Sequence, residues 1–127
     1  MNMHPRVLVA DDDRDLLDAV AAAVTEMGAD VVRAETGGDL IERMADEGPF
    51  DLVITDIAMP WMNGLQALHA ARTAGDETPV IVMTAMKSEH IPAQVEAVGK
   101  TLLLQKPFGL DELAEAVTRL LDRQGSS

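Results

Sequence analysis

The chain has 127 residues, of which 47% are hydrophobic, and this size suits one domain built around a single core. Its 22 acidic and 10 basic residues leave a formal net charge of −12, which disfavours direct binding to nucleic acid phosphates. Cysteine is absent, so disulfides and thiolate metal sites are excluded. No apolar run reaches the ~20 residues of a membrane span and the N-terminal residues lack a signal-peptide pattern, so we expect a cytoplasmic protein without a membrane partner.

Predicted strands and helices alternate five times along the chain. Apolar runs predict strands at residues 6–10, 30–34, 51–55, 79–84 and 101–105. The segments between and after them have apolar residues at helical spacing, and they predict helices between Asp13 and Gly28 and at 37–48, 64–75, 88–99 and 109–124. The residues expected to face inward are Leu17, Val20, Ala21, Val24 and Met27 in the first helix, Leu40, Ile41 and Met44 in the second, and Leu113, Val117, Leu120 and Leu121 in the last.

The predicted strands are continuously apolar, which is typical of a parallel sheet covered by helices on both faces. Right-handed crossovers then give an open, doubly wound α/β sheet, in which ligands bind at the carboxyl ends of the strands. No linker, repeat or low-complexity stretch divides the sequence. We therefore expect one domain over residues 1–127, with its core at about 6–123.

Four of the five predicted strands end in carboxylate, hydroxyl or ammonium groups. The first strand is followed by Asp11 and Asp12, and the third is followed by Asp56. The fourth strand ends at Thr84, and the fifth runs into Lys106. One such residue alone is usually a helix cap or a solvated charge, but their joint occurrence at one edge of the sheet indicates a site.

Three clustered carboxylates favour a hard divalent cation such as Mg²⁺, with Mn²⁺ as an alternative. A bound cation would relieve their mutual repulsion, which is ~4 kcal/mol for a contacting pair near a protein surface. A carboxylate beside the metal can attack phosphorus, while an ammonium and a hydroxyl neutralise the phosphoryl oxygens. Asp56 suits the nucleophile because it stands alone on its strand, and the adjacent Asp11 and Asp12 suit metal binding.

Four stretches together resemble the receiver domains of two-component response regulators: "VLVADDD", "DLVITDIAMPWMNG", "VIVMTA" and "KPF". They match the signature regions of that family in order and spacing, and the resemblance runs from about Arg6 to Arg123. It implies the flavodoxin-like strand order 2-1-3-4-5, known from a chemotaxis receiver.

The resemblance also implies a role for each site residue. Asp56 corresponds to the phospho-acceptor, Asp12 to the direct metal ligand and Asp11 to a ligand acting through water. The remaining correspondences are Ala58 with a backbone carbonyl ligand, Thr84 with the switch hydroxyl, Lys106 with the phosphate-binding lysine, Pro60 and Gly64 with the loop after the acceptor, and Pro107 with a proline that commonly follows a cis bond.

Three positions depart from the family pattern. Leu103 stands where relatives usually have Tyr, Phe or His, and Ala58 and Met86 are apolar where many relatives have a polar group. The departures leave the catalytic groups in place and bear on signal transmission and on the lifetime of the phosphorylated state. We expect Leu103 to stay packed inward in both states, and we expect slow dephosphorylation because Ala58 and Met86 cannot orient a water.

Two other classes of protein compete with this interpretation. A haloacid-dehalogenase-like phosphatase would use Asp11 and Asp13 as its Asp-x-Asp pair and Thr84 as its second motif, but it would leave Asp56 without a role. A phosphorylation-independent adaptor of the same fold is suggested by Leu103 alone. Turnover of small phosphate esters would favour the phosphatase, and lack of labelling by acetyl phosphate would favour the adaptor.

The sequence thus predicts a phosphoacceptor domain that catalyses only its own phosphorylation and dephosphorylation. A histidine kinase or a phosphotransfer protein would supply the phosphoryl group to Asp56. The transfer would alter the face made by the fourth and fifth helices and the fifth strand, and a downstream protein target would read this change. We expect a monomer or a weak dimer that does not itself bind nucleic acid.

Overall fold

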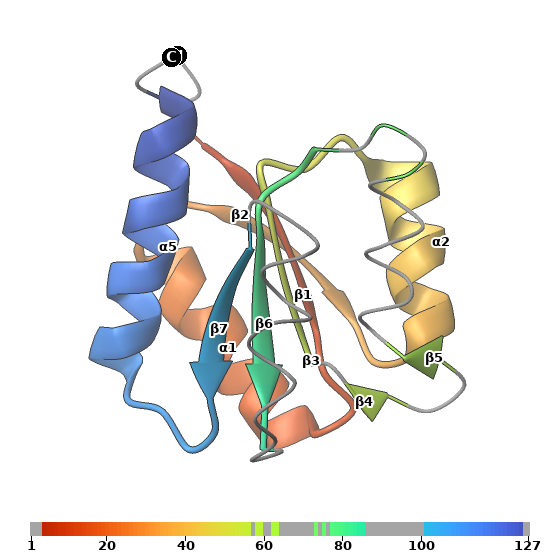
Figure 1. Ribbon diagram of the computed structural model, residues 1–127, viewed down its shortest axis with the longest axis horizontal. Coiled ribbons are helices and arrows are strands. Elements are labelled where there is room, and N and C mark those ends of the chain that lie inside the picture. The colour runs from red at the N-terminus through yellow and green to blue at the C-terminus, as the bar shows by residue number, and fades with distance from the viewer. Residues whose placement is uncertain are drawn as a thin grey trace.

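The computed structural model describes residues 4–56, 58–59, 62–63, 73, 75, 77–85 and 101–125. One parallel sheet consists of β1 (Arg6–Ala10), β2 (Asp30–Ala34), β3 (Leu52–Asp56), β6 (Val80–Thr84) and β7 (Thr101–Gln105). Their spatial order is β2-β1-β3-β6-β7, which confirms the expected 2-1-3-4-5 order. Because the strands are parallel, their carboxyl ends share one edge, toward which the arrowheads of β6 and β7 point in Figure 1.

Helices cover both faces of the sheet. α1 (Arg14–Glu26) and α5 (Leu110–Gly125) lie together on one face, and α2 (Gly37–Glu47) lies on the other (Figure 1). The start of α1 is capped by Asp13, as predicted, and Gly28 follows the helix with φ of 98°, a conformation that favours glycine. No helix among the described residues is long and apolar enough to cross a membrane.

The apolar strand residues divide into two layers, because successive side chains of a strand point to opposite faces of the sheet. The layer beneath α1 and α5 includes Val7, Val9, Leu52, Ile54, Ile81 and Met83, packed with Leu17, Val20, Val24, Leu113, Val117 and Leu120. The layer beneath α2 includes Leu8, Ala10, Val53, Val80 and Val82, packed with Leu40. Both faces are therefore covered, which is why the strands read as unbroken apolar runs.

Two residues expected to face inward are exposed instead. Ile41 is 42% exposed, because α2 turns only a narrow stripe toward the sheet and Leu40 fills it. Met27 is 40% exposed, because α1 ends at Glu26 and Met27 already belongs to its C-cap. The other inward predictions for α1 hold, since Leu17, Val20, Ala21 and Val24 are all buried.

A small antiparallel hairpin follows β3 and was not among the predicted elements. Its strands are β4 (Ala58–Met59) and β5 (Met62–Asn63), with Ala58 opposite Asn63. The helices expected at 64–75 and 88–99 lie outside the described residues, apart from residues 73 and 75.

Arg6 is the first residue of β1, at the edge of the sheet opposite the predicted site, and it contacts the connection between α2 and β3. Its guanidinium donates to the backbone carbonyl of Glu47 at the end of α2, and it lies over the Phe50 ring at 5.0 Å from the centroid. The Arg6 backbone N–H donates to Asp51 Oδ2 at 2.8 Å. These contacts join β1 to the connection between α2 and β3.

Candidate functional site

An acidic pocket forms where β1 and β3 end. Asp11 follows the last residue of β1 and is fully buried, and Asp56 is the last residue of β3 and only 8% exposed. Asp12 follows Asp11 and is exposed. One carboxylate oxygen from each of the three residues lies within 4.8 Å of the other two. The structure therefore brings together the three carboxylates that the sequence placed at this edge.

Lys106 brings a positive charge between two of these carboxylates. Its Nζ donates to Asp11 Oδ2 at 2.9 Å and to Asp56 Oδ2 at 2.8 Å. The Lys106 side chain is 17% exposed, so water screens the contacts weakly. The other oxygen of Asp11, Oδ1, accepts the backbone N–H of Asp13 at 2.9 Å. Charge-assisted hydrogen bonds thus fix the position of Asp11 from both sides.

Burial and the ammonium shift the proton affinities of this group. Burial raises the pKa of Asp11 above its ordinary value, although the hydrogen bonds from Asp13 and Lys106 act in the opposite direction. Burial alone would lower the pKa of Lys106, but its hydrogen bonds to Asp56 and Asp11 outweigh this effect and raise it. Lys106 therefore stays protonated at neutral pH and can face an anion.

The donor chemistry fits a hard divalent cation. Three carboxylates supply only oxygen ligands, which Mg²⁺ and Mn²⁺ prefer, and no thiol competes because the chain has no cysteine. Both Asp11 oxygens already accept hydrogen bonds, whereas Asp12 is exposed. The more accessible carboxylate for a metal is therefore Asp12.

Asp13 has a structural role and is not part of this group of oxygens. Its Oδ1 accepts the backbone N–H groups of Asp15 at 3.1 Å and Leu16 at 3.2 Å, which caps α1. The phosphatase interpretation needs this carboxylate as its second catalytic acid. Because Asp13 is engaged as a helix cap, the geometry does not support that interpretation.

Thr84 ends β6 beside Lys106 and is fully buried. Its carbonyl oxygen accepts the backbone N–H of Lys106 at 2.7 Å. It also accepts a hydrogen bond from the side-chain Nε2 of Gln105 at 3.1 Å, a residue that was not among the predicted site residues. The signal for Gln105 is its strand register: it lies directly opposite Thr84, and the sequence alone does not show this pairing.

The structure describes only some of the remaining predicted site residues. The bond between Lys106 and Pro107 is cis, as the resemblance implied. Leu103 is partly buried and packs against the apolar layer beneath α2. Ala58 lies in β4, next to the acidic pocket in sequence. Pro60, Gly64 and Met86 lie outside the described residues.

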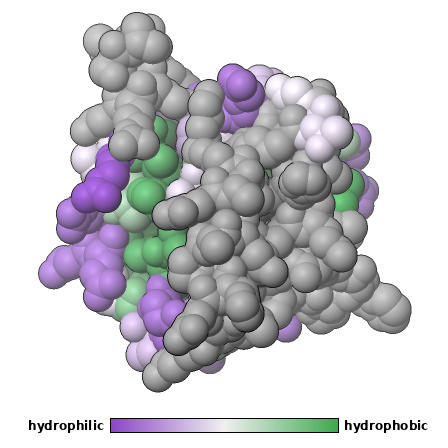
Figure 2. All heavy atoms as spheres, in the orientation of Figure 1, coloured by the Kyte–Doolittle hydropathy of each residue, from purple (hydrophilic) through white to green (hydrophobic). Residues whose placement is uncertain are grey.

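An apolar strip follows the outer edge of β7. In Figure 2 it appears as green atoms beside the purple, hydrophilic side chains of α5. A shallow hollow of about 220 Å³ lies between the two elements. It is lined by Leu102, Leu103, Leu104, Glu112, Glu115, Ala116 and Arg119.

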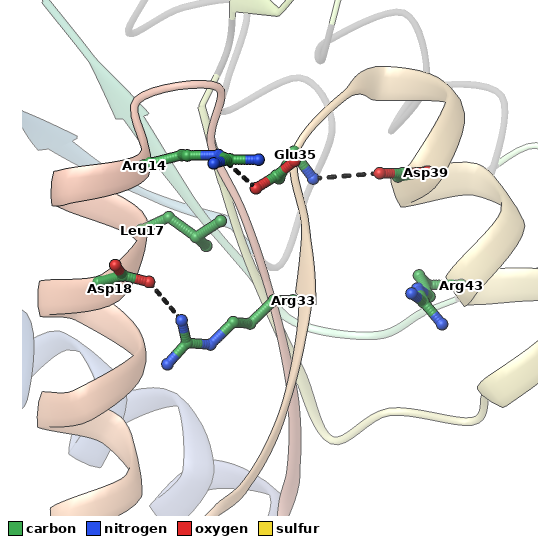
Figure 3. A pocket seen from close by; sticks show the side chains of 7 residues that line it. All are labelled: Arg14, Leu17, Asp18, Arg33, Glu35, Asp39 and Arg43. Atoms are coloured by element: carbon green, nitrogen blue, oxygen red, sulfur yellow. Dashed lines mark hydrogen bonds and ion pairs between the residues drawn. The ribbon is translucent and has the colours of Figure 1, made fainter.

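A larger hollow of about 340 Å³ opens beside β2 at the other edge of the sheet, and it is unrelated to the acidic pocket (Figure 3). Three arginines line it, namely Arg14, Arg33 and Arg43. They are ion-paired with Glu35, Asp18 and Glu47 respectively. Its charges are therefore balanced locally, and it shares no lining residue with the acidic pocket.

The fold and the pocket define a class of protein: α/β proteins with a doubly wound parallel sheet that carry clustered carboxylates and a lysine where the strands end. Comparison with known proteins gives the family. The sequence model of the response regulator receiver domain matches residues 7–118. The chain belongs to this family and is the receiver domain of a two-component response regulator.

Individual relatives agree with this assignment. Response regulator MprA of Mycolicibacterium vanbaalenii is 33% identical over 121 residues, which cover 95% of this chain and 52% of MprA. The chain therefore spans about half the length of that relative. The Francisella response regulator 1452 receiver domain is 30% identical, with a TM-score of 0.88 over 95% of this chain and 99% of that one.

A further solved structure is informative about the site. Response regulator TrrA of Thermotoga maritima, in complex with Mg²⁺ and BeF, is 30% identical to this chain. Its TM-score is 0.80 over 92% of this chain and 99% of that one. A relative with the same fold therefore binds a divalent cation.

Proposed function

We propose that Asp56 accepts a phosphoryl group from a phosphohistidine of a partner kinase or phosphotransfer protein. An Asp56 carboxylate oxygen forms the new P–O bond, the P–N bond breaks, and the departing imidazole takes up a proton from solvent. The position of Lys106 carries this proposal. Its Nζ is held 2.8 Å from Asp56, where it can also neutralise an oxygen of the incoming phosphoryl group.

The carboxylates and one carbonyl would hold the metal. We assign direct ligation to Asp12, Asp56 and the backbone carbonyl of Ala58, with Asp11 acting through water. When bound, Mg²⁺ or Mn²⁺ supplies neutralisation of the charge on the phosphoryl oxygens. The cluster of three carboxylate oxygens supports this assignment, and so does the metal complex of the relative TrrA.

The remaining groups would transmit the change. Thr84 would donate its hydroxyl to a phosphoryl oxygen, while Leu103 stays packed inward. The surface that changes would include β7 and α5, whose apolar strip and acidic side chains offer a downstream protein a place to bind.

The test is labelling with acetyl phosphate. We expect Mg²⁺-dependent phosphorylation of the wild type, visible as a mass increase of one phosphoryl group, and none in Asp56→Asn. Asp12→Asn should need much more Mg²⁺, because it loses the exposed carboxylate. Labelling of Asp56→Asn at the wild-type rate would show that another residue is the acceptor, and no labelling of the wild type would favour the adaptor.

A further inference from the structure

Gln105, the last residue of β7, has a side-chain amide that contacts the backbones of two site residues. Its Nε2 donates to the carbonyl oxygen of Thr84 at 3.1 Å and to that of Lys106 at 3.4 Å. Carbonyl oxygens only accept hydrogen bonds, so the amide nitrogen, and not the amide oxygen, must face them. One uncharged side chain thus bridges the residues that supply the hydroxyl and the ammonium of the proposed site.

The bridge lies where the pairing of β6 with β7 ends. Thr84 is opposite Gln105 in the strand register, and this is the last pair between the two strands. The Thr84 carbonyl also accepts the backbone N–H of Lys106 at 2.7 Å. Beyond this point the chain leaves the sheet on both sides, through Ala85 after β6 and through the bend at Lys106 and Pro107 after β7. The Gln105 amide therefore adds a cross-link where the backbone ladder stops.

We propose that Gln105 is a positioning residue that fixes the spacing between Thr84 and Lys106 and so speeds phosphoryl transfer to Asp56. The inference rests on the proposed function. A phosphoryl group would be contacted by Thr84 from one strand and by Lys106 from the next. A shift of one strand end relative to the other misplaces one of these contacts, and small misplacements of catalytic groups cost rate.

Two substitutions separate the hydrogen bond from the shape of the side chain. Gln105→Met keeps a long, unbranched side chain and removes both donated hydrogen bonds. Gln105→Glu keeps the shape, but its carboxylate accepts only and would face two carbonyl oxygens. Gln124→Met is the matched control, because it makes the same change in the last turn of α5, ~20 Å along that helix from its start near Lys106.

Three quantities are measured for each variant: the rate of phosphorylation by acetyl phosphate at saturating Mg²⁺, the Kd for Mg²⁺ by calorimetry, and the Tm. We expect the rate to fall about three- to tenfold in Gln105→Met, which is the factor corresponding to one ordinary hydrogen bond, because the second contact, at 3.4 Å, is weak. The rate should fall further in Gln105→Glu. The Mg²⁺ Kd of Gln105→Met should stay within about twofold of wild type, because its ligands lie on other strands. Gln124→Met should match wild type in all three.

Three results would overturn the inference while leaving the proposed function intact. These are a wild-type rate in Gln105→Met, an equal loss of rate in Gln124→Met, or a parallel weakening of Mg²⁺ binding that shows general distortion of the pocket. A wild-type protein that acetyl phosphate does not label would overturn the proposed function and this inference together.

Discussion

Replacing Lys106 by Met is expected to destabilise the folded protein strongly and in a pH-dependent way. Lys106 Nζ lies 2.9 Å from an oxygen of fully buried Asp11 and 2.8 Å from an oxygen of Asp56. Methionine retains most of the apolar stem and removes the ammonium. The variant therefore leaves two neighbouring carboxylates without their shared counter-charge, while the packing around the stem changes little.

The expected magnitude follows from the distances and the burial. At an effective dielectric constant of about 20, each contact corresponds to an attraction of ~6 kcal/mol, which is offset by the cost of burying the ions. Removing one partner of a buried pair typically costs ~3–5 kcal/mol. The lower end applies here, because the Asp56 side chain is 11% exposed and retains some hydration. We expect the free energy of unfolding to fall by about 3 kcal/mol at pH 7 without metal, or about two orders of magnitude in the unfolding equilibrium.

The deficit should shrink on both sides of neutral pH. Burial already raises the pKa of Asp11, and losing the ammonium raises it further, so the folded variant binds a proton more tightly than the unfolded chain. The stability of the variant therefore rises relative to wild type as the pH falls through the pKa of Asp11 in the folded state. The gain is complete below pH ~4, the ordinary pKa of an aspartate in the unfolded chain. In wild type, the pKa of Lys106 is higher in the folded state than its ordinary value of ~10.4, so protonated Lys106 stabilises the fold fully below that pH. This stabilisation is lost as the pH rises through the pKa of Lys106 in the folded state.

Urea denaturation followed by circular dichroism, between about pH 4 and about pH 11 and in the presence of a chelator, measures the effect. Millimolar Mg²⁺ should restore part of the stability at pH 7, since it also neutralises the carboxylates. Asp11→Asn in the Lys106→Met background should restore it without metal. A deficit that is the same throughout this pH range, or that Asp11→Asn does not reduce, would refute the electrostatic explanation and indicate lost packing instead.

Three further effects should be measurable. Arg6→Met should lower the free energy of unfolding by about 1–2 kcal/mol, because it removes a hydrogen bond and a ring contact. Arg119→Met breaks only an exposed ion pair and should change the free energy of unfolding little, so equal effects would contradict the role of the Arg6 contacts. Thr36→Val should lower the free energy of unfolding by about 1 kcal/mol, because it removes the N-cap of α2, whereas Thr36→Ser keeps the capping hydroxyl and should not. An equal loss of stability in Thr36→Ser would exclude capping as the cause. Mg²⁺ should raise the Tm of wild type in differential scanning fluorimetry, EDTA should reverse this rise, and Asp12→Asn should require much more Mg²⁺ to produce it. An unchanged Mg²⁺ response in that variant would place the ion elsewhere.

The sheet and the pocket were predictable from sequence because both depend on strand ends. Unbroken apolar runs predicted all five sheet strands to within a residue, and the parallel arrangement then placed the residues after them along one edge. That is sufficient to bring Asp11, Asp56 and Lys106 together without knowing any distance. Strand order needed the family resemblance, because periodicity does not say which strands are neighbours.

The features that were missed depend on information that local patterns do not contain. The β4–β5 hairpin has strands of two residues, too short for any periodicity to appear. Ile41 differs from Leu40 by one step around α2, and the width of the covered stripe is set by the sheet beneath it. The contact of Gln105 with Thr84 requires the register of two strands separated by a long connection. Tertiary packing decides each of these.

The ion pair between Lys106 and Asp11 joins residues 95 positions apart, and the pair with Asp56 joins residues 50 apart. During synthesis the ribosome delivers all three carboxylates of the pocket well before it delivers β7. Until that strand docks in register, like charges face one another at the sheet edge without an ammonium between them, and their repulsion opposes closure. Under the proposed function, a copy in which β7 has not yet paired lacks the Lys106 ammonium at the pocket, and it should therefore accept a phosphoryl group poorly.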